Sequence, residues 1–234
     1  MNGSVSEPRE RLLVALADQL KLPLLQIARG AELAGLGKST RSNIAYTADV
    51  ALRLIDGYIL SIAPKQAKLE LEPVSVSAVL QDTAQRLAQL AQQYECDLQI
   101  SLSGKYGPVM ANRKNLEAAF TMLGYSFIEA QQHADGKRPS VILGAHKSVN
   151  GLVAGIFGSQ SGISGEMFRR AKALYGSARQ PLPAGTAFGS AGIFIADSLL
   201  QSMASPLKPA KYNKLMGLGA TLLPSQQLSF AGVV

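Results

Sequence analysis

The chain has little of several residue types that carry much of protein chemistry. Its 234 residues include one cysteine, two histidines and no tryptophan. Cys96 therefore cannot form an intramolecular disulfide, and we expect a buried, small apolar side chain there. No His or Cys spacing typical of a metal site is present, and His133 and His146 are interpreted as surface residues.

Long apolar runs are also missing. No stretch approaches the roughly 20 residues that a membrane-spanning helix requires, and the N-terminal residues lack the pattern of a secretory signal. The sequence therefore predicts a cytoplasmic protein with no membrane span.

The formal net charge is +7, which allows an acidic partner such as nucleic acid, anionic lipid or an acidic protein. Lysines and arginines are spread thinly, however. No basic run longer than a pair, such as Arg169-Arg170, is interleaved with aromatic residues. This pattern argues against a groove for single-stranded nucleic acid.

The length suits two domains, and residues 1–66 have the pattern of a helical hairpin. Two stretches of apolar residues at three-and-four spacing flank the loop Gly35–Thr40, and Pro64 ends the second stretch. A hairpin with an apolar stripe on each helix cannot bury both stripes alone, so we expect two copies to pair into a four-helix bundle. The stripes are Leu13, Leu16, Leu20, Leu24, Ile27 and Ala31, then Ile44, Ala48, Ala51, Ile55, Tyr58 and Ile62.

The first predicted helix contains a proline, Pro23, and the residues around it resemble a known sequence motif. The segment Ala17-Asp18-Gln19-Leu20-Lys21-Leu22-Pro23-Leu24 resembles the S-H-E-L-R-T-P-L box of sensor histidine kinases. Asp18 stands at the position of the phosphorylated histidine. We interpret Asp18 as an exposed helix carboxylate, because the surrounding sequence lacks the acidic cluster on which a phosphoacceptor aspartate depends.

Two later segments extend the resemblance. Residues 68–77, Lys-Leu-Glu-Leu-Glu-Pro-Val-Ser-Val-Ser, resemble the junction K-L-E-L-E-P-V-D-L-S, and Pro108–Arg113 resembles the turn P-V-L-A-D-R of these kinases. The chain is also similar to dimeric histidine phosphotransferases of that architecture. The resemblance implies an α+β protein in which an antiparallel helical hairpin (1–66), dimerising into a four-helix bundle, precedes a GHKL-type α/β sandwich (67–234).

Periodicity within residues 67–234 agrees with this architecture. Ser77 is a candidate N-cap for a helix with one apolar face, and the alternation at 98–102 is typical of a strand. The apolar face Leu116–Phe127 predicts the next long helix. Further strands are expected at 141–145, 152–157 and 220–223, and a last helix at 192–203.

The resemblance also marks positions where the nucleotide chemistry of the family is altered. Ser126 replaces the asparagine that helps to hold magnesium and phosphate, and Gly158 replaces the aspartate that accepts the adenine amino group. Glu129 adds negative charge where a lysine is common. We therefore expect ATP and magnesium binding to be lost, with no cofactor and no metal. The degenerate pocket positions are Ser126, Gly158, Gly162, Ser190, Gly192 and Thr221.

The sequence thus favours a catalytically degenerate, dimeric adapter or regulator in two-component signalling, with no catalytic residue. Its expected partner is a response regulator receiver domain or a sensor kinase. Two alternatives stay open: an active phosphotransfer protein or histidine kinase, and a basic module for nucleic acid or a membrane surface. The surface expected to bind the partner comprises Gln19, Lys21, Leu22, Leu25 and Arg29.

Overall fold

A computed structural model describes residues 27, 44, 51–52, 55–57, 69–102, 104–130, 138–159 and 187–225. The predicted hairpin and four-helix bundle lie almost entirely outside these residues. So do Asp18, Gly162, His133 and the five residues expected to bind a partner. None of the described helices is both long and apolar enough to cross a membrane.

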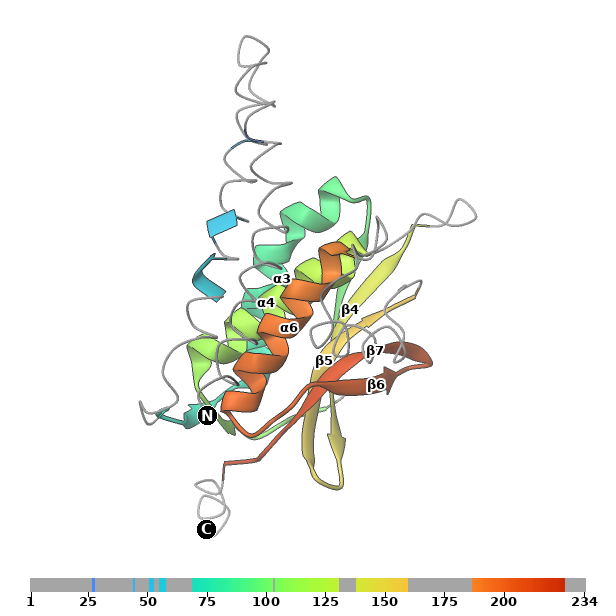
Figure 1. Ribbon diagram of the computed structural model, residues 1–234. Coiled ribbons are helices and arrows are strands. Elements are labelled where there is room, and N and C mark those ends of the chain that lie inside the picture. Colours follow the sequence, from blue (N-terminus) through green and yellow to red (C-terminus); the bar gives the residue numbers. More distant parts are fainter. Residues whose placement is uncertain are drawn as a thin grey trace, which may run out of the picture.

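A five-stranded mixed sheet with three helices on one face forms the described body of the chain (Figure 1). The strand order is β2-β4-β5-β7-β6, with β2 parallel to β4 and the other neighbours antiparallel. The strands are β2 (Asp97–Leu102), β4 (Ser140–Ser148), β5 (Gly151–Gly158), β6 (Lys208–Tyr212) and β7 (Leu215–Leu222). The helices are α3 (Val76–Gln93), α4 (Arg113–Glu129) and α6 (Ala187–Ser202). A two-stranded sheet pairs β1 (Glu72–Val74) with β3 (Val109–Ala111).

Side-chain caps fix where the first two helices begin. Ser75, in extended conformation, accepts a hydrogen bond from the Ala78 amide and is the N-cap of α3. The prediction of Ser77 as this cap was wrong, because the helix has already begun at Val76. Asn112 caps α4 by accepting a hydrogen bond from the Asn115 amide at 3.1 Å.

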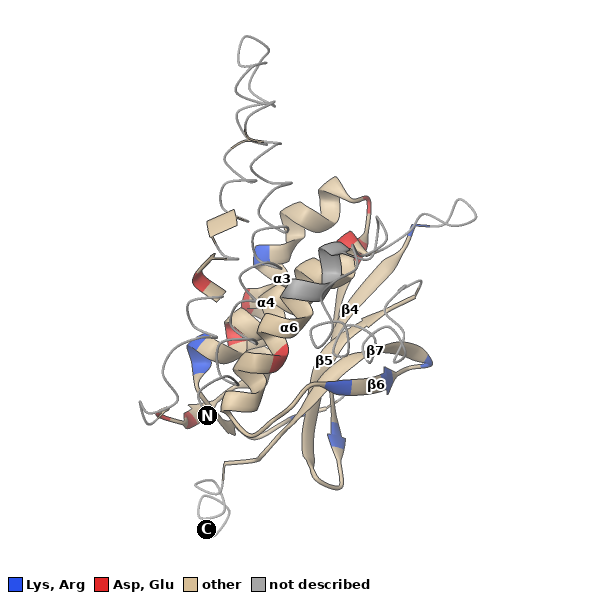
Figure 2. Ribbon diagram, viewed as in Figure 1, with Lys and Arg blue, Asp and Glu red and all other residues tan. Residues whose placement is uncertain are grey.

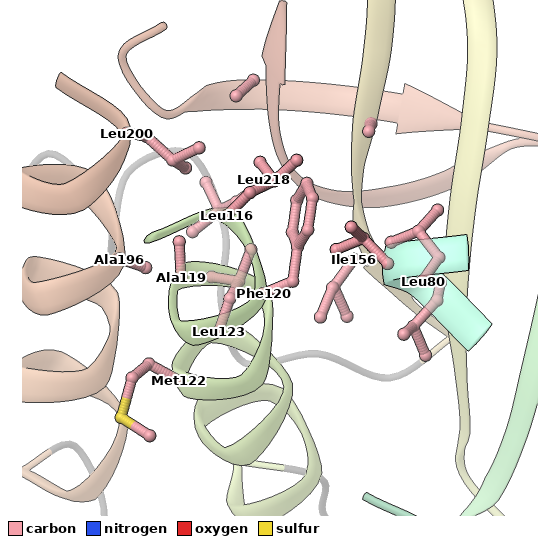
Figure 3. Packing of buried hydrophobic residues seen from close by; sticks show 14 of the residues in the cluster. Leu80, Leu116, Ala119, Phe120, Met122, Leu123, Ile156, Ala196, Leu200 and Leu218 are labelled. Atoms are coloured by element: carbon pink, nitrogen blue, oxygen red, sulfur yellow. The ribbon is translucent and has the colours of Figure 1, made fainter. Parts of the chain in front are cut away.

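The core lies between the helices and the sheet. Val141, Leu143 and Ala145 on β4 are fully buried, and Leu152, Ala154 and Ile156 on β5 alternate in the same way. The expected strands at 98–102, 141–145 and 152–157 are confirmed. Figure 3 shows the centre of this packing, where Phe120 of α4 lies among Leu116, Leu123 and Leu218.

The opposite face of the sheet carries a smaller aromatic cluster. Tyr212, on the edge strand β6, packs against Phe157 with ring centroids 5.3 Å apart, and its hydroxyl lies 2.8 Å from the Ser101 hydroxyl on the other edge strand, β2. The sheet is therefore strongly curled, because residues of its two edge strands touch. His146 is part-buried with its ring centroid 5.7 Å from that of Tyr212, so its interpretation as a surface residue was wrong.

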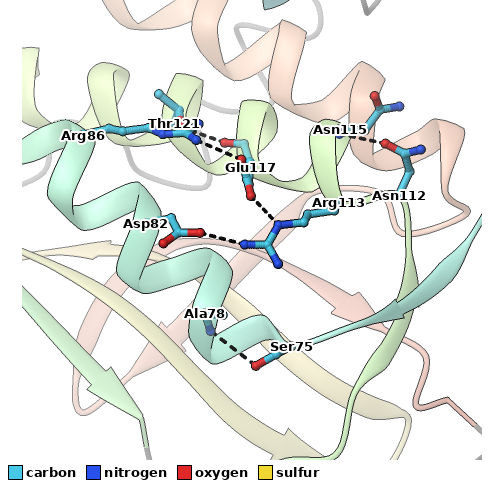
Figure 4. Close-up of polar contacts among 9 residues, drawn as sticks. All are labelled: Ser75, Ala78, Asp82, Arg86, Asn112, Arg113, Asn115, Glu117 and Thr121. Atoms are coloured by element: carbon cyan, nitrogen blue, oxygen red, sulfur yellow. Dashed lines mark hydrogen bonds and ion pairs between the residues drawn. The ribbon is translucent and has the colours of Figure 1, made fainter.

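An ion-pair chain links the outer surfaces of α3 and α4 (Figure 4). Arg113 contacts Asp82 and Glu117 at 2.8 Å each, and Glu117 also receives Arg86 at 3.0 Å. Apolar packing already joins these two helices. Most of the ion pairs are solvent-exposed, so they add little to the stability of that contact.

The close approach of β7 to β5 at Gly217 can be tested by adding a side chain there. A Cβ there would overlap the Ile156 carbonyl oxygen and lie 2.7 Å from the Phe157 Cα, so we expect Gly217→Ala to destabilise the protein by about 3 kcal/mol. A Cβ at Gly219 meets nothing closer than 3.1 Å, so Gly219→Ala is the control, with a loss of about 1 kcal/mol. Urea denaturation measures both, and equal losses would contradict the close approach at Gly217.

Candidate functional site

The predicted nucleotide positions that the structure describes are distributed over four elements. Ser126 lies in the last turn of α4, Gly192 in α6, and Gly158 at the end of β5. Ser190 also belongs to α6, of which the structure describes only the backbone at that residue. Thr221 lies on β7.

Ser126 and Gly192 form the centre of a tight helix-to-helix contact. Ser126 is fully buried, and its hydroxyl donates a hydrogen bond to the Met122 carbonyl oxygen at 3.0 Å. A Cβ at Gly192 would overlap Ser126 Oγ and lie 2.9 Å from the Met122 carbonyl oxygen. α4 and α6 thus approach as closely as a glycine allows, and we call this contact the α4–α6 seam.

The seam also receives a residue from the region of the expected hairpin. A Cβ built at Gly57 would lie 3.3 Å from Ile195 Cγ2 and 3.4 Å from Met122 Cγ. Gly57 and Ala51 are buried, whereas Leu52 is 60% exposed. Gly57 therefore packs on α4 and α6, one turn along from Ser126 and Gly192.

Gly158 lies on the same side of the sheet as the seam. It is buried, it pairs with Val141 and Met216, and it continues the alternation of Ala154 and Ile156, which face the helices. A glycine presents no carboxylate at this position, so the adenine acceptor that the resemblance implies has no counterpart in its side chain.

Thr221 is not brought together with the other positions. Its neighbours Ala220 and Leu222 are buried in the core, so the part-buried Thr221 lies on the opposite face of β7, across from Val153. Side chains alternate along a strand, so a strand in which Leu218 faces the helices also turns Ala220 toward them and Thr221 away. This alternation was the signal in the sequence that could have placed Thr221 correctly. Sequence reasoning also missed Met122, which reaches both Gly57 and Gly192.

A buried carboxyl group ends α4. Burial raises the pKa of Glu129 from 4.5 to about 7, and its Oε2 accepts no hydrogen bond from the described residues. Burial, together with the charge of Glu129, raises the pKa of Tyr94 to about 12. Glu129 is therefore only partly ionised at neutral pH, and its negative charge is weaker than the sequence alone suggests.

Magnesium and ATP are the groups that the resemblance implies, and two described positions, Ser126 and Gly158, do not offer the side-chain ligands that the resemblance assigns there. The Ser126 hydroxyl is buried and engaged with a backbone carbonyl, and the residue at the end of β5 is a glycine. No group of three or more His, Cys, Asp or Glu residues in the described ranges could hold a metal ion. Cys96 is buried, as predicted, and burial raises its thiol pKa to about 11.

Comparisons with known proteins identify the fold. No protein family matches the sequence, and no curated protein matches it. Solved structures do match. The histidine kinase AdeS of Acinetobacter baumannii aligns over 88% of this chain and 98% of its own, with 11% identity and a TM-score of 0.56. The catalytic domain of histidine kinase ThkA aligns over 66% and 95%, with 10% identity and a TM-score of 0.52.

The described body of the chain has the histidine kinase catalytic-domain fold. A bacterial phosphotransferase is similar over a longer span, 94% of this chain and 98% of its own, at 11% identity and a TM-score of 0.52. The GHKL-type sandwich expected from the sequence is therefore confirmed at the level of the fold.

Replacing Ser126 with the asparagine that the resemblance implies should not restore nucleotide binding. We expect Ser126→Asn to destabilise the protein by about 2 kcal/mol, because the larger amide meets Gly192 and the Met122 carbonyl. Ser126→Ala keeps the packing and should cost within about 1 kcal/mol. Urea denaturation gives both values, and a stable Ser126→Asn protein whose melting temperature rises with Mg-ATP would contradict the tight seam.

Glu129 should make stability depend on pH. Its folded pKa exceeds its unfolded value, so the folded protein binds the proton more tightly and this contribution to stability falls as pH rises from about 4.5 to about 7. Relative to wild type, Glu129→Gln should gain up to about 3 kcal/mol on going from pH 4 to pH 8. Glu72→Gln, at an exposed position, is the control, and parallel pH profiles for wild type and Glu129→Gln would disprove the burial of this carboxyl.

Proposed function

We propose that this chain is a catalytically degenerate histidine-kinase-like protein, a pseudokinase that acts by binding in two-component signalling. The observation that carries the proposal is the α4–α6 seam. At Ser126, where the resemblance expects a metal-binding asparagine, the side chain is enclosed between two helices and bonded to the Met122 carbonyl oxygen.

Three separate parts of phosphoryl transfer are altered together. The attacking imidazole is replaced by Asp18, the magnesium-binding amide by Ser126, and the adenine acceptor by Gly158. These groups perform different steps, so the loss of one does not cause the loss of another. Their joint replacement favours a protein that keeps the architecture and acts without nucleotide.

In this proposal the chain is a cytoplasmic homodimer whose helical hairpin presents a docking surface. A receiver domain carries an acidic pocket, which Lys21 and Arg29 would attract, while Leu22 and Leu25 supply apolar contact beside Gln19. The partner is then a response regulator, or a sensor kinase whose own hairpin pairs with this one.

A second candidate is a phosphotransfer protein that needs no ATP. It is favoured by the similarity to a bacterial phosphotransferase over 94% of this chain. It requires an acceptor on the hairpin, where Asp18 occupies the expected position. Label moving onto this chain from a phosphorylated receiver domain would support this candidate over the binding role.

The loss of nucleotide binding is tested by thermal denaturation of the full chain with millimolar Mg-ATP, Mg-ADP or neither. A ligand raises the melting temperature only when it binds the folded state, so we expect three coincident curves. A clear upward shift with Mg-ATP, or transfer of its terminal phosphate to the protein, would overturn the proposal.

The docking role is tested in the same preparation with purified receiver domains by surface plasmon resonance. The variant Lys21→Glu/Leu25→Asp should lose receiver binding by about ten-fold or more. The matched control Lys105→Glu/Leu71→Asp makes the same chemical changes at exposed described positions and should bind as wild type does. Equal binding by wild type and the first variant would discard the hairpin surface.

A further inference from the structure

The net charge of the chain resides in one part of it. Residues 1–134 hold thirteen Lys and Arg and thirteen Asp and Glu, so they are neutral. Residues 135–234 hold ten Lys and Arg but only three Asp and Glu, which accounts for the whole net charge of +7. An excess of one sign gathered in one part of a protein creates a field that attracts ligands of the opposite sign.

Of the five described lysines and arginines in residues 135–234, three lie on the hairpin of β6 and β7 (Figure 2), and the other two, Arg138 and Lys147, lie just before and on β4. Lys208, Lys211 and Lys214 are exposed, and no Asp or Glu occurs between Ser198 and Ser225. None of the three lysines makes an ion pair with a described residue. On α3 and α4, in contrast, Arg86 and Arg113 are paired with acidic side chains.

The strand register spreads these lysines around the free edge of the sheet. Lys208 pairs with Gly219 and Lys211 with Met216, so the two side chains lie on opposite faces of β6. Lys214 lies in the two-residue turn with Asn213, where both residues have positive φ. Met216 is 40% exposed beside Lys211. We call Lys208, Lys211, Lys214 and Met216 the basic hairpin.

Protection of a sheet edge explains only part of this surface. Lysine and proline on an edge strand discourage pairing with another strand, and Lys208, Pro209 and Lys211 fit that role. Lys214 lies in the turn and Met216 on the inner strand β7, where edge protection requires neither. Pro209 also lacks an N–H group, so a partner would bind through side chains rather than as an added strand.

The residues of the basic hairpin suit some classes of anionic partner better than others. Tyr212 is the aromatic residue of β6 and is 4% exposed, so it offers no stacking platform for bases. Three cations are fewer than the roughly six to ten phosphate contacts of strong duplex binding, and they are a weak membrane anchor. Met216 adds an adaptable apolar contact of the kind that protein partners use.

We propose that the basic hairpin binds an acidic protein segment that contains an apolar side chain. The strand β6 has five residues and spans about 17 Å, which matches a short segment of a partner. Lysines attract the acidic side chains, and Met216 contacts the apolar one. This surface belongs to the sandwich and does not depend on the function proposed above for the helical hairpin.

The test uses the full chain and a fluorescent twelve-residue peptide of Glu and Asp with a central Leu. Fluorescence anisotropy should show binding that weakens with added salt. Lys208→Glu/Lys211→Glu/Lys214→Glu should reduce the affinity by about ten-fold or more, and Met216→Ser by about three-fold with an unchanged salt dependence. The control Lys105→Glu/Lys114→Glu/Arg138→Glu changes the total charge equally at other exposed positions and should lower the affinity less than about two-fold.

Circular dichroism of each variant confirms folding, and Lys214→Glu alone, in the turn, serves if the triple variant unfolds. Equal losses in the triple variant and its control would overturn the proposal, because they indicate an effect of total charge. So would absence of peptide binding at about 20 mM salt. Tighter binding at about 150 mM salt to a DNA oligonucleotide, or to vesicles containing phosphatidylglycerol, would assign the surface to that other partner.

Discussion

The closeness of α4 and α6 is the constraint on which the rest of the described structure depends. A glycine at position 192 lets the helices meet with Ser126 and the Met122 carbonyl between them. The same two helices cover the sheet through Phe120 of α4 and Leu200 of α6, and Gly57 packs along the same line. Any larger side chain at the seam has to separate helices that the core holds together.

The packing of the described fold does not depend on the side-chain chemistry for nucleotide contact that the resemblance assigns to some of its positions. The buried face of the sheet and the apolar sides of α3, α4 and α6 account for the packing, and none of those residues needs a nucleotide. Gly158 lies at the end of β5, whereas Ser126, in the last turn of α4, is itself fully buried and is part of the packing between α4 and α6. The position that the resemblance assigns to metal binding therefore has a structural role in this fold.

Periodicity predicted the parts of the fold in which burial follows a simple repeat. The strands β4 and β5 contain short, nearly continuous apolar runs, and α4 has a continuous apolar face, so all three were recognised. The strand β6 was missed because Lys-Pro-Ala-Lys-Tyr shows no apolar alternation, and its position is set by pairing with β7. The cap was misplaced because Ser75 and Ser77 are chemically equal, and only the geometry of β1 decides between them.

The candidate site was predicted less completely than the fold. Motif comparison found Ser126, Gly158 and Gly192, which lie on one side of the sheet. It placed Thr221 with them because motif letters carry no information about which face of a strand a residue occupies. Contacts between distant segments, such as Met122 with Gly57, leave no local pattern in a sequence.

The hydroxyl of Tyr212 joins two strands that are 111 residues apart in sequence. Since β6 and β2 are the two edge strands of the same sheet, this bond bridges the curled sheet through side chains and leaves the backbones of the two edges unpaired with each other. Contacts between residues so far apart in sequence carry a large loop-closure entropy, so we expect this bond to form late in folding. Once formed, it restrains the two margins of the sheet against moving apart.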